Sequence, residues 1–399
     1  MRKIYDKEDQ TLAFGAQEFE ALYARVCSDG DCVLRLEKCA FDNEERYQVF
    51  AARNRVTIRG GRGRAVLYGV YDYFRRAYGV AYFWDTDRFP QEKRPFQAIE
   101  IDEAPRFSIR GLRYFAHRGL HRFQAEHWGK ADWERELKYL VKKRFNFYML
   151  RIGMDDLFQQ AFPDSAAYPP EDGCLLEGKR GFYDRSLFWP LQYRAALRAH
   201  IHAFADTLDL MAPVDCGTMT HWYSQTPADF VEKERPDFLN QSNDLYTDPT
   251  ELVWDIRKER NLENYFKLTD AYVRAYGEQG FFHTIGLAER LFSTDREENL
   301  KLKIYTYERI QEHLQKHYPD ARLLIASWDF SMFWHAEEVR ALLDTLDRRR
   351  CIIFDYTSDS ADETSNFLTW GVRGNFPYIF GIFHAYEPNS ELRGDYGRI

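Results

Sequence analysis

FFHTIGLAER (Phe281–Arg290) and CIIFDYTSD (Cys351–Asp359) are two apolar runs that each lead into acidic residues. Both have the length and composition of buried strands, and helical stretches separate them along the chain. Strands that alternate with helices indicate parallel βα units, and a barrel built from such units places its chemistry where the strands end. We therefore expect Glu289 and Asp359 to face one pocket.

The same pattern recurs from Ile109 to His384. The predicted strands are Ile109–Ala116, Phe147–Ile152, Leu208–Val214, Phe282–Leu287, Arg322–Ser327, Cys351–Tyr356 and Tyr378–His384. The predicted helices between them are Trp133–Lys143, Tyr193–Thr207, Leu262–Tyr276, Leu300–Lys316 and Ala336–Leu346. This alternation predicts an α/β fold with a (β/α)8-type TIM barrel. Such a barrel closes with eight strands, so a count of seven predicts that the last βα unit is missing.

The first hundred residues have a different pattern. They predict a small α/β sandwich domain over residues 1–100, followed by the barrel domain over residues 101–399 with about seven βα units. The predicted elements are a helix at Glu18–Val26, strands at Cys32–Leu36, Arg46–Ala51 and Arg55–Arg59, a helix at Val66–Arg76 and a strand at Val80–Trp84. Arg53-Asn54 is a turn candidate, and the proline-bearing segment Phe89–Pro105 is predicted to be a linker.

A cluster of glycines, Gly60-Gly61-Arg62-Gly63, lies between a predicted strand and a predicted helix. Such a turn is able to cradle a phosphate at the helix N-terminus. However, Val66 stands where the dinucleotide-binding fingerprint has Gly or Ala, and no clean βαβ unit follows. We therefore favour a tight strand-to-helix turn without a nucleotide.

Composition and charge argue against several classes of protein. The chain has 399 residues and a net charge of −8 that is spread along its length, which argues against nucleic acid as a partner. The N-terminus MRKIYDKEDQ has no apolar signal core, and no run approaches membrane-spanning length. We expect no membrane partner and a cytoplasmic protein as the sequence is given, or a secreted one if a signal was removed.

Cysteine and histidine patterns give no sign of a metal centre. The six cysteines form no CxxC pair, so reduced thiols in the core are the favoured interpretation. The spacing of His117, His121 and His127 fits no common ligand pattern. We expect neither a metal nor a cofactor.

The two acids each have a competing structural interpretation. Glu289 follows an apolar strand, where an apolar wall could keep a carboxylic acid protonated as a proton donor. A salt bridge to Arg290 or Arg296 is the alternative. The segment DYTSDSADE also offers Asp355, Asp362 and Glu363 beside Asp359, and Asp355 could equally be a buried acid pointing inward. The alternative for the whole segment is a solvated acidic loop that caps a helix, and the segment alone does not choose between these interpretations.

Several polar and aromatic residues are expected at the same mouth. His384, Tyr386 and Asn389 follow the seventh predicted strand and can hydrogen-bond sugar hydroxyls, while the Tyr ring packs on a sugar face. His221 and Trp222 follow the third predicted strand, and Trp328 follows the fifth. An ordinary packed tryptophan, or a histidine with its hydrogen bonds satisfied at a strand end, is the alternative for each.

The order of these segments resembles glycoside hydrolase family 89, the α-N-acetylglucosaminidases. The resemblance spans Ile109 to Gly394. It rests on RYFAH (Arg113–His117), DWERELKYLVKKRFN (Asp132–Asn146), GMDDLFQQAF (Gly153–Phe162), LAE (Leu287–Glu289), FWHAEEVRALL (Phe333–Leu343), DYTSDS (Asp355–Ser360) and PYIFGIFHAYEPNSELRG (Pro377–Gly394). Asp155 stands at a glutamate of the family and His117 at an asparagine. Asp359 stands at the nucleophilic glutamate, and Glu387-Pro388 replaces a Gly-Gly pair.

The resemblance implies an exo-acting retaining α-glycosidase of the α-N-acetylglucosaminidase type, with a carbohydrate as partner and no cofactor. It implies Glu289 as acid/base and Asp359 as nucleophile, with His117, Asp155 and the residues at the mouth holding the terminal sugar. It also implies a large helical domain after the barrel, which this chain lacks. Two alternatives stay open: another exo-glycosidase of the α-glucuronidase or β-hexosaminidase type, and an inactive sugar-binding homologue or fragment.

Overall fold

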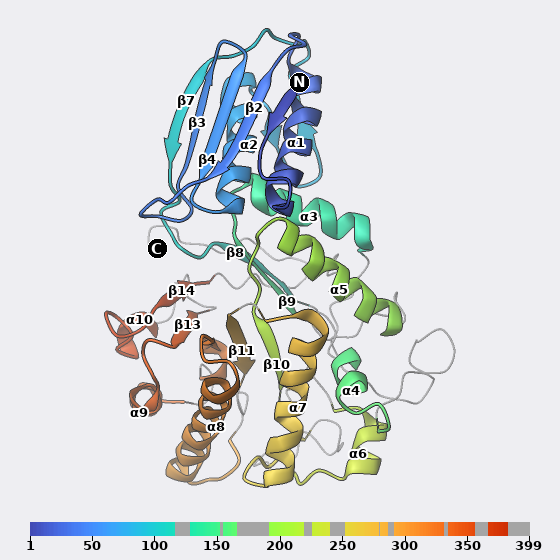
Figure 1. The fold of residues 1–399 in the computed structure, drawn as a ribbon. Coiled ribbons are helices and arrows are strands. Elements are labelled where there is room, and N and C mark those ends of the chain that lie inside the picture. The colour runs from blue at the N-terminus through green and yellow to red at the C-terminus, as the bar shows by residue number, and fades with distance from the viewer. Residues whose placement is uncertain are drawn as a thin grey trace. The chain divides into compact units, whose positions relative to one another are not determined.

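The computed structural model describes residues 1–115, 128–151, 155–165, 191–218, 226–239, 252–278, 280–285, 291–330, 334–355 and 366–381. Contacts divide the chain into two compact units. The first unit comprises Met1–Arg113, Trp128–Met149 and Leu197–Met211, and the second unit comprises Tyr114–His127, Leu150–Ala196 and Ala212–Ile399. Figure 1 shows the fold and labels most of the helices and strands.

The first unit contains a mixed five-stranded sheet. Its strands lie in the order β1 (Arg2–Ile4), β2 (Val33–Lys38), β4 (Arg55–Gly60), β3 (Tyr47–Ala52) and β7 (Ile99–Glu103). The first three run parallel, whereas β3 is antiparallel to both β4 and β7. Arg53 and Asn54 join β3 to β4 with φ values of 50° and 55°, the left-handed conformation of a tight hairpin turn. The predicted turn is therefore confirmed.

Two long helices cover one face of this sheet. They are α1 (Gln10–Val26) and α2 (Gly63–Tyr78), which pack on each other and on the central strands. Alternate residues of the strands, such as Leu34, Val49 and Ile58, are buried, whereas Phe50 on the other face is exposed. This period-two pattern is the one expected of a sheet with one covered face. The strands β5 (Ala81–Tyr82) and β6 (Asp87–Arg88) form a small hairpin after α2.

Two sequence-based predictions in this region need correction, and one strand was missed. The first helix begins at Gln10, two turns before the predicted Glu18. Asp9 caps its N-terminus, and Gly15 is a buried residue within the helix. The segment Phe89–Pro105 is not only a linker: it contains β7, whose alternation Ile-Glu-Ile-Asp-Glu buries Ile101 at the sheet edge. The prolines around it concealed this strand. The short edge strand β1 was not predicted.

The glycine cluster forms the predicted tight turn, and an internal carboxylate occupies its anion-binding end. β4 ends at Gly60 and α2 begins at Gly63. A Cβ at Gly61 would lie 2.4 Å from the carbonyl oxygen of Glu44, so the close backbone approach requires glycine. Asp209 Oδ2 accepts hydrogen bonds from Arg64 N at 3.0 Å and from Arg62 Nε at 2.8 Å. Asp209 thus takes the place that a phosphate would have at the helix N-terminus.

A buried ionic network joins distant segments of the first unit. Arg64 is almost fully buried, and its guanidinium donates to Glu45 through Nε and to the carbonyl oxygen of Asp209 through Nη1 at 2.8 Å. Glu45 also binds Arg110 Nη2 at 2.7 Å and Asn146 Nδ2 at 2.8 Å. Because every member has partners of the right kind, the cost of burying these charges is offset by charge-assisted hydrogen bonds.

The second unit contains a five-stranded parallel sheet. Its strands follow one another in chain order: β10 (Val214–Thr218), β11 (Phe281–Ile285), β12 (Arg322–Ala326), β13 (Cys351–Asp355) and β14 (Tyr378–Phe380). β8 (Gly111–Phe115) and β9 (Phe147–Arg151) pair with each other. Sequential parallel strands joined by helices are the arrangement of a TIM barrel.

The remaining helices connect these strands. They are α3 (Lys130–Lys142), α4 (Asp155–Ala161), α5 (Leu191–Thr207), α6 (Ala228–Glu234), α7 (Glu259–Tyr276), α8 (Arg296–His317), α9 (Ala336–Thr345) and α10 (Asn366–Thr369). Tyr265 and Tyr272 of α7 and Tyr307 of α8 pack in one core cluster with strand residues such as Phe282 and Ile353. None of the described helices is long and apolar enough to cross a membrane.

One predicted barrel strand was misplaced. The strand expected at Leu208–Val214 lies instead at Val214–Thr218. Leu208 is buried directly after α5, and Asp209 has a left-handed φ of 57° that places its carboxylate on α2. The apolar run from Leu208 to Val214 resembles a strand, but its first part is the turn that ends a helix. The other six predicted strands overlap β8, β9 and β11–β14.

The cap of α1 gives a test of local stability. Asp9 Oδ1 accepts from the N–H groups of Thr11 and Leu12 at 3.0 Å each, and Oδ2 lies 2.5 Å from Lys38 Nζ. Partial burial raises the pKa of Asp9, but the hydrogen bonds from Lys38, Leu12 and Thr11 outweigh it and leave the pKa below its ordinary value. Replacing such a cap with alanine costs about 1 kcal/mol of unfolding free energy.

We expect Asp9→Ala to lower the unfolding free energy at pH 7 by about 1 kcal/mol and Asp9→Asn to lower it less, because an amide oxygen still accepts. A depressed folded-state pKa contributes stability that is present above the unfolded pKa of about 3.9 and is lost as pH falls through the folded value. The difference in unfolding free energy between wild type and Asp9→Asn should therefore disappear as the pH falls. Urea unfolding across pH 3–7 measures it, with exposed Glu8→Ala as control. A gap independent of pH would contradict the assignment.

Candidate active site

The carboxyl ends of four adjacent strands meet at one edge of the parallel sheet. β11 ends at Ile285, β12 at Ala326, β13 at Asp355 and β14 at Phe380. Neighbouring strands lie about 4.8 Å apart, so the ends of β11 and β13 are separated by about 10 Å. The segments that carry Glu289 and Asp359 leave the sheet from these two ends.

A layer of buried polar side chains lies at this edge. Thr284 in β11 is fully buried, and its hydroxyl lies 3.0 Å from the hydroxyl of Tyr265 in α7. Asp329 after β12 and Asp355 at the end of β13 are buried as well. Buried polar groups are retained where they are hydrogen-bonded, and each of these groups has such partners.

Asp329 is held by an ammonium group and a phenol from the same helix. It ends the short 3-10 turn Ser327–Asp329 that follows β12. Its Oδ1 lies 2.8 Å from Lys303 Nζ, and its Oδ2 accepts from Tyr307 Oη at 2.5 Å. Lys303 and Tyr307 are four residues apart on α8 and so lie on the same helix face. The ion pair fixes the turn after β12 to α8.

Asp355 is a buried, hydrogen-bonded acid at the end of β13. Its carboxylate accepts hydrogen bonds from Tyr378 Oη and, at 3.2 Å, from Asn366 Nδ2, and its side chain is fully buried. The interpretation of Asp355 as an inward-pointing buried acid is therefore confirmed. The other acids of that segment, Asp359, Asp362 and Glu363, lie outside the described residues.

Most of the predicted site residues also lie outside the described residues. They are His117, His221, Trp222, Glu289, Asp359, His384, Tyr386 and Asn389. Asp155 is the first residue of α4, and Trp328 lies in the turn after β12, so only their backbone positions are described. The histidines His117, His121 and His127 lie outside as well. Among the described residues, no cluster of three or more His, Cys, Asp or Glu side chains could hold a metal.

The sequence analysis did not single out Lys303 and Tyr307. A signal was present, since Lys303 interrupts the buried stripe of α8 formed by Leu302, Thr306, Ile310 and Leu314. A lysine on the buried face of a helix needs an acidic partner. Asp329, three residues past the end of β12, was the nearest candidate.

Comparison with family models relates the C-terminal part of the chain to a glycosidase family. Residues 218–399 match the family model of the alpha-N-acetylglucosaminidase (NAGLU) TIM-barrel domain. No curated protein matches the chain. The resemblance to glycoside hydrolase family 89 is confirmed.

Solved structures share the fold at low sequence identity. A family 89 glycoside hydrolase from Clostridium perfringens, in complex with PUGNAc, aligns with a TM-score of 0.65 and 15% identity over 95% of this chain. The chain spans 43% of that protein. A family 20 β-N-acetylhexosaminidase from Streptomyces coelicolor aligns with a TM-score of 0.60 and 13% identity, over 99% of this chain and 74% of its own. Together with the family match, these likenesses identify an α/β fold with a TIM-barrel domain.

The buried ion pair of Lys303 and Asp329 gives a second test. We expect Lys303→Met to lower the unfolding free energy by about 3–5 kcal/mol, because the buried carboxylate of Asp329 loses its ammonium partner. The double variant Lys303→Met/Asp329→Leu should recover a large part of this loss, since no buried charge then remains. Urea unfolding of the full chain measures both.

The matched control is Lys301→Met, two residues earlier on α8. Lys301 pairs with Glu297 at 2.7 Å, and both side chains are largely exposed, so this change should leave stability nearly unchanged. Similar losses for Lys301→Met and Lys303→Met would contradict a stabilising role for the buried pair.

Proposed function

We propose that this chain is an exo-acting retaining α-glycosidase of the α-N-acetylglucosaminidase type. The observation that carries the proposal is the family match over residues 218–399, which includes Glu289, Asp359 and the strands that lead to them. A related family 89 enzyme from Clostridium perfringens was solved with its substrate GlcNAc-alpha-1,4-galactose. The proposed substrate is accordingly a terminal α-linked N-acetylglucosamine.

The proposed mechanism uses two carboxyl groups in two steps. Glu289 protonates the glycosidic oxygen while Asp359 attacks the anomeric carbon, so the leaving group departs and a covalent glycosyl-enzyme forms. Glu289, now ionised, then takes a proton from water, which attacks the anomeric carbon and releases the sugar with its original configuration. Carboxyl groups in retaining enzymes lie about 5–5.5 Å apart. Because Asp is one methylene shorter than Glu, we expect a somewhat wider gap here.

The remaining predicted residues would hold the terminal sugar. They are His117, Asp155, His221, Trp222, Trp328, His384, Tyr386 and Asn389. Aromatic rings would pack against the sugar face, and the polar groups would bind its hydroxyls. The backbone of Trp328 follows β12, between the strands that precede Glu289 and Asp359, which supports a role for it at the site.

The proposal includes the architecture around the site. We propose that residues 1–100 are a small α/β sandwich domain preceding the barrel of residues 101–399, and that one further βα unit completes the barrel. No cofactor, nucleic acid or membrane takes part, and a helical domain assists the barrel in closing the pocket. The protein would act in the cytoplasm, or outside the cell if a signal was removed.

A panel of nitrophenyl glycosides separates this function from its rivals. We expect hydrolysis of the α-N-acetylglucosaminide. Preferential hydrolysis of the β-N-acetylglucosaminide would favour the β-hexosaminidase alternative. The fold shared with family 20 enzymes is the observation behind that alternative. Preference for an α-glucuronide would favour the α-glucuronidase alternative. No hydrolysis of any member, with sugar binding intact, would favour the inactive homologue.

The two acids are distinguished by azide rescue. We expect Glu289→Gln to lower kcat by about 10²–10⁴-fold on the nitrophenyl substrate, because general acid catalysis contributes about that much. Azide should rescue Glu289→Ala and yield an α-glycosyl azide, whereas it should rescue Asp359→Ala and yield the β-azide. Glu297→Gln, an exposed acid on α8, is the control. A melting temperature that falls with no selective loss of activity would instead indicate structural roles.

The variant Asp359→Glu tests the effect of the shorter side chain that stands here in place of the family's glutamate. We expect Asp359→Glu to raise the rate at which the glycosyl-enzyme forms, because the added methylene brings the carboxylate to the distance of a retaining pair. Pre-steady-state release of nitrophenol measures this step. Formation of the glycosyl-enzyme by Asp359→Asn at the wild-type rate would mean that Asp359 is not the attacking group.

A further inference from the structure

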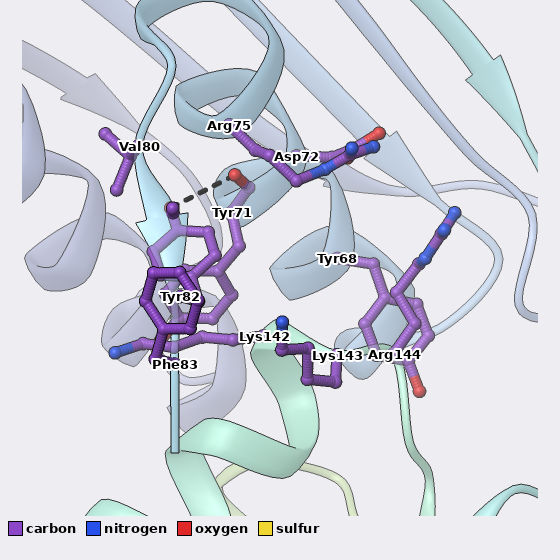
Figure 2. A pocket seen from close by; sticks show the side chains of 11 residues that line it. Tyr68, Tyr71, Asp72, Arg75, Val80, Tyr82, Phe83, Lys142, Lys143 and Arg144 are labelled. Atoms are coloured by element: carbon purple, nitrogen blue, oxygen red, sulfur yellow. Dashed lines mark hydrogen bonds and ion pairs between the residues drawn. The ribbon is translucent and has the colours of Figure 1, made fainter. Parts of the chain in front are cut away.

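A cavity of about 330 Å³ lies in the first unit. Its walls come from α2, from the segment around β5 and from the end of α3, as Figure 2 shows. The lining residues are Tyr68, Tyr71, Asp72, Arg75, Val80, Ala81, Tyr82, Phe83, Lys142, Lys143 and Arg144. A volume of this size holds a monosaccharide.

The lining carries more positive than negative charge. Its four cations are Arg75, Lys142, Lys143 and Arg144, and its one acid is Asp72. Asp72 is engaged by two arginines, with Arg75 Nη2 at 2.5 Å and Arg76 Nε at 2.8 Å. Lys142 is paired with Asp87 at 2.6 Å. In the described part of the chain, no carboxylate is within salt-bridge distance of Lys143 or Arg144.

Arg144 is held in a conformation that favours glycine. Its φ is 62°, and it follows Lys143, the C-cap residue of α3. The hydrogen bonds Phe145 N to Leu140 O at 2.9 Å and Arg144 N to Val141 O at 2.9 Å are those of a Schellman motif, in which this position is usually glycine. A long cation here costs backbone strain that glycine would avoid. The guanidinium donates to the hydroxyl of Tyr47 at 3.1 Å, a neutral partner.

The aromatic walls are fixed in place before any ligand binds. Tyr68, Tyr71 and Tyr82 are buried, and Tyr82 Oη donates to the carbonyl oxygen of Tyr71 at 3.1 Å, the bond dashed in Figure 2. Phe83 differs, because its side chain is half exposed. Lys142 Nζ lies 5.3 Å from the centre of the Tyr82 ring. The cavity therefore combines buried aromatic walls, more cations than acids, and the half-exposed phenyl ring of Phe83. This combination suits a ring-shaped anion.

We propose that this cavity binds a sugar-sized ligand that carries an oxyanion, namely a sulfate, phosphate or carboxylate group. Lys143 and Arg144 bind the oxyanion, and the ring of Phe83 covers the apolar face of the sugar. Guanidinium and ammonium groups are the natural donors to such anions. None of the lining residues is among those proposed for hydrolysis, so the test of this site does not depend on catalysis.

The test is calorimetric titration of the full chain with four probes: glucose 6-sulfate, glucose 6-phosphate, glucuronate and neutral glucose. Inorganic sulfate is a fifth probe. We expect saturable binding of at least one charged sugar with a Kd of about 1 mM or tighter, weakened by added salt. Lys143→Gln/Arg144→Gln should weaken it at least about tenfold, as expected for the loss of two charge-assisted contacts.

Two further variants separate binding from folding. Lys130→Gln/Arg135→Gln makes the same change of charge on exposed positions of α3 outside the cavity, and it should leave binding unchanged. Arg144→Gly should lose affinity while melting no lower than wild type, because glycine relieves the left-handed strain. The proposal is overturned by any of three results: no charged sugar binds, glucose or inorganic sulfate binds as tightly as the charged sugars, or affinity survives Lys143→Gln/Arg144→Gln.

Discussion

The first unit depends on the buried carboxylate of Glu45 and the guanidinium of Arg64. Around this pair gather Arg110, Asn146 and Asp209, from segments separated by up to 164 positions in the sequence between Glu45 and Asp209. An ion buried to this degree is stable only when all its partners are in place, so the network forms as a whole or not at all. This explains why the segments 128–149 and 197–211 belong to the same compact unit as the N-terminal sheet. Two arginines bridge residues that no local interaction would bring together.

Local sequence patterns predicted most of the regular elements, because each element buries one face. Alternation identified β2, β3 and β4, and a repeat of apolar residues every three to four positions identified α7 and α8. The errors arose where a local pattern had another cause. Leu208 belongs to an apolar run because it closes the end of α5, and the following Asp209 is needed for the ionic network. β7 was missed because prolines surround it, although Ile99 and Ile101 alternate with acids.

The candidate site was predictable in outline only. The sequence placed the two acids after β11 and β13, since parallel strands share one carboxyl edge. It left open the roles of the acids at and after the end of β13, and of these the structure describes the contacts of Asp355, with Tyr378 and Asn366. No periodicity reveals such contacts, because the three residues come from a strand, a short helix and the next strand. The positions of Glu289 and Asp359 depend on the segments beyond the strand ends, where no repeating pattern constrains the backbone.

The buried polar side chains at the carboxyl edge of the parallel sheet limit which positions can be substituted. Thr284, Asp329 and Asp355 are bound to Tyr265, to Lys303 and Tyr307, and to Tyr378, so a substitution among them leaves a buried polar group without its partner. Such substitutions destabilise the fold before they alter the pocket. The departures from the family pattern follow the ends of strands, at His117, Asp155, Asp359 and Glu387-Pro388. The buried contacts at the strand ends therefore limit which side chains can be substituted there without loss of stability.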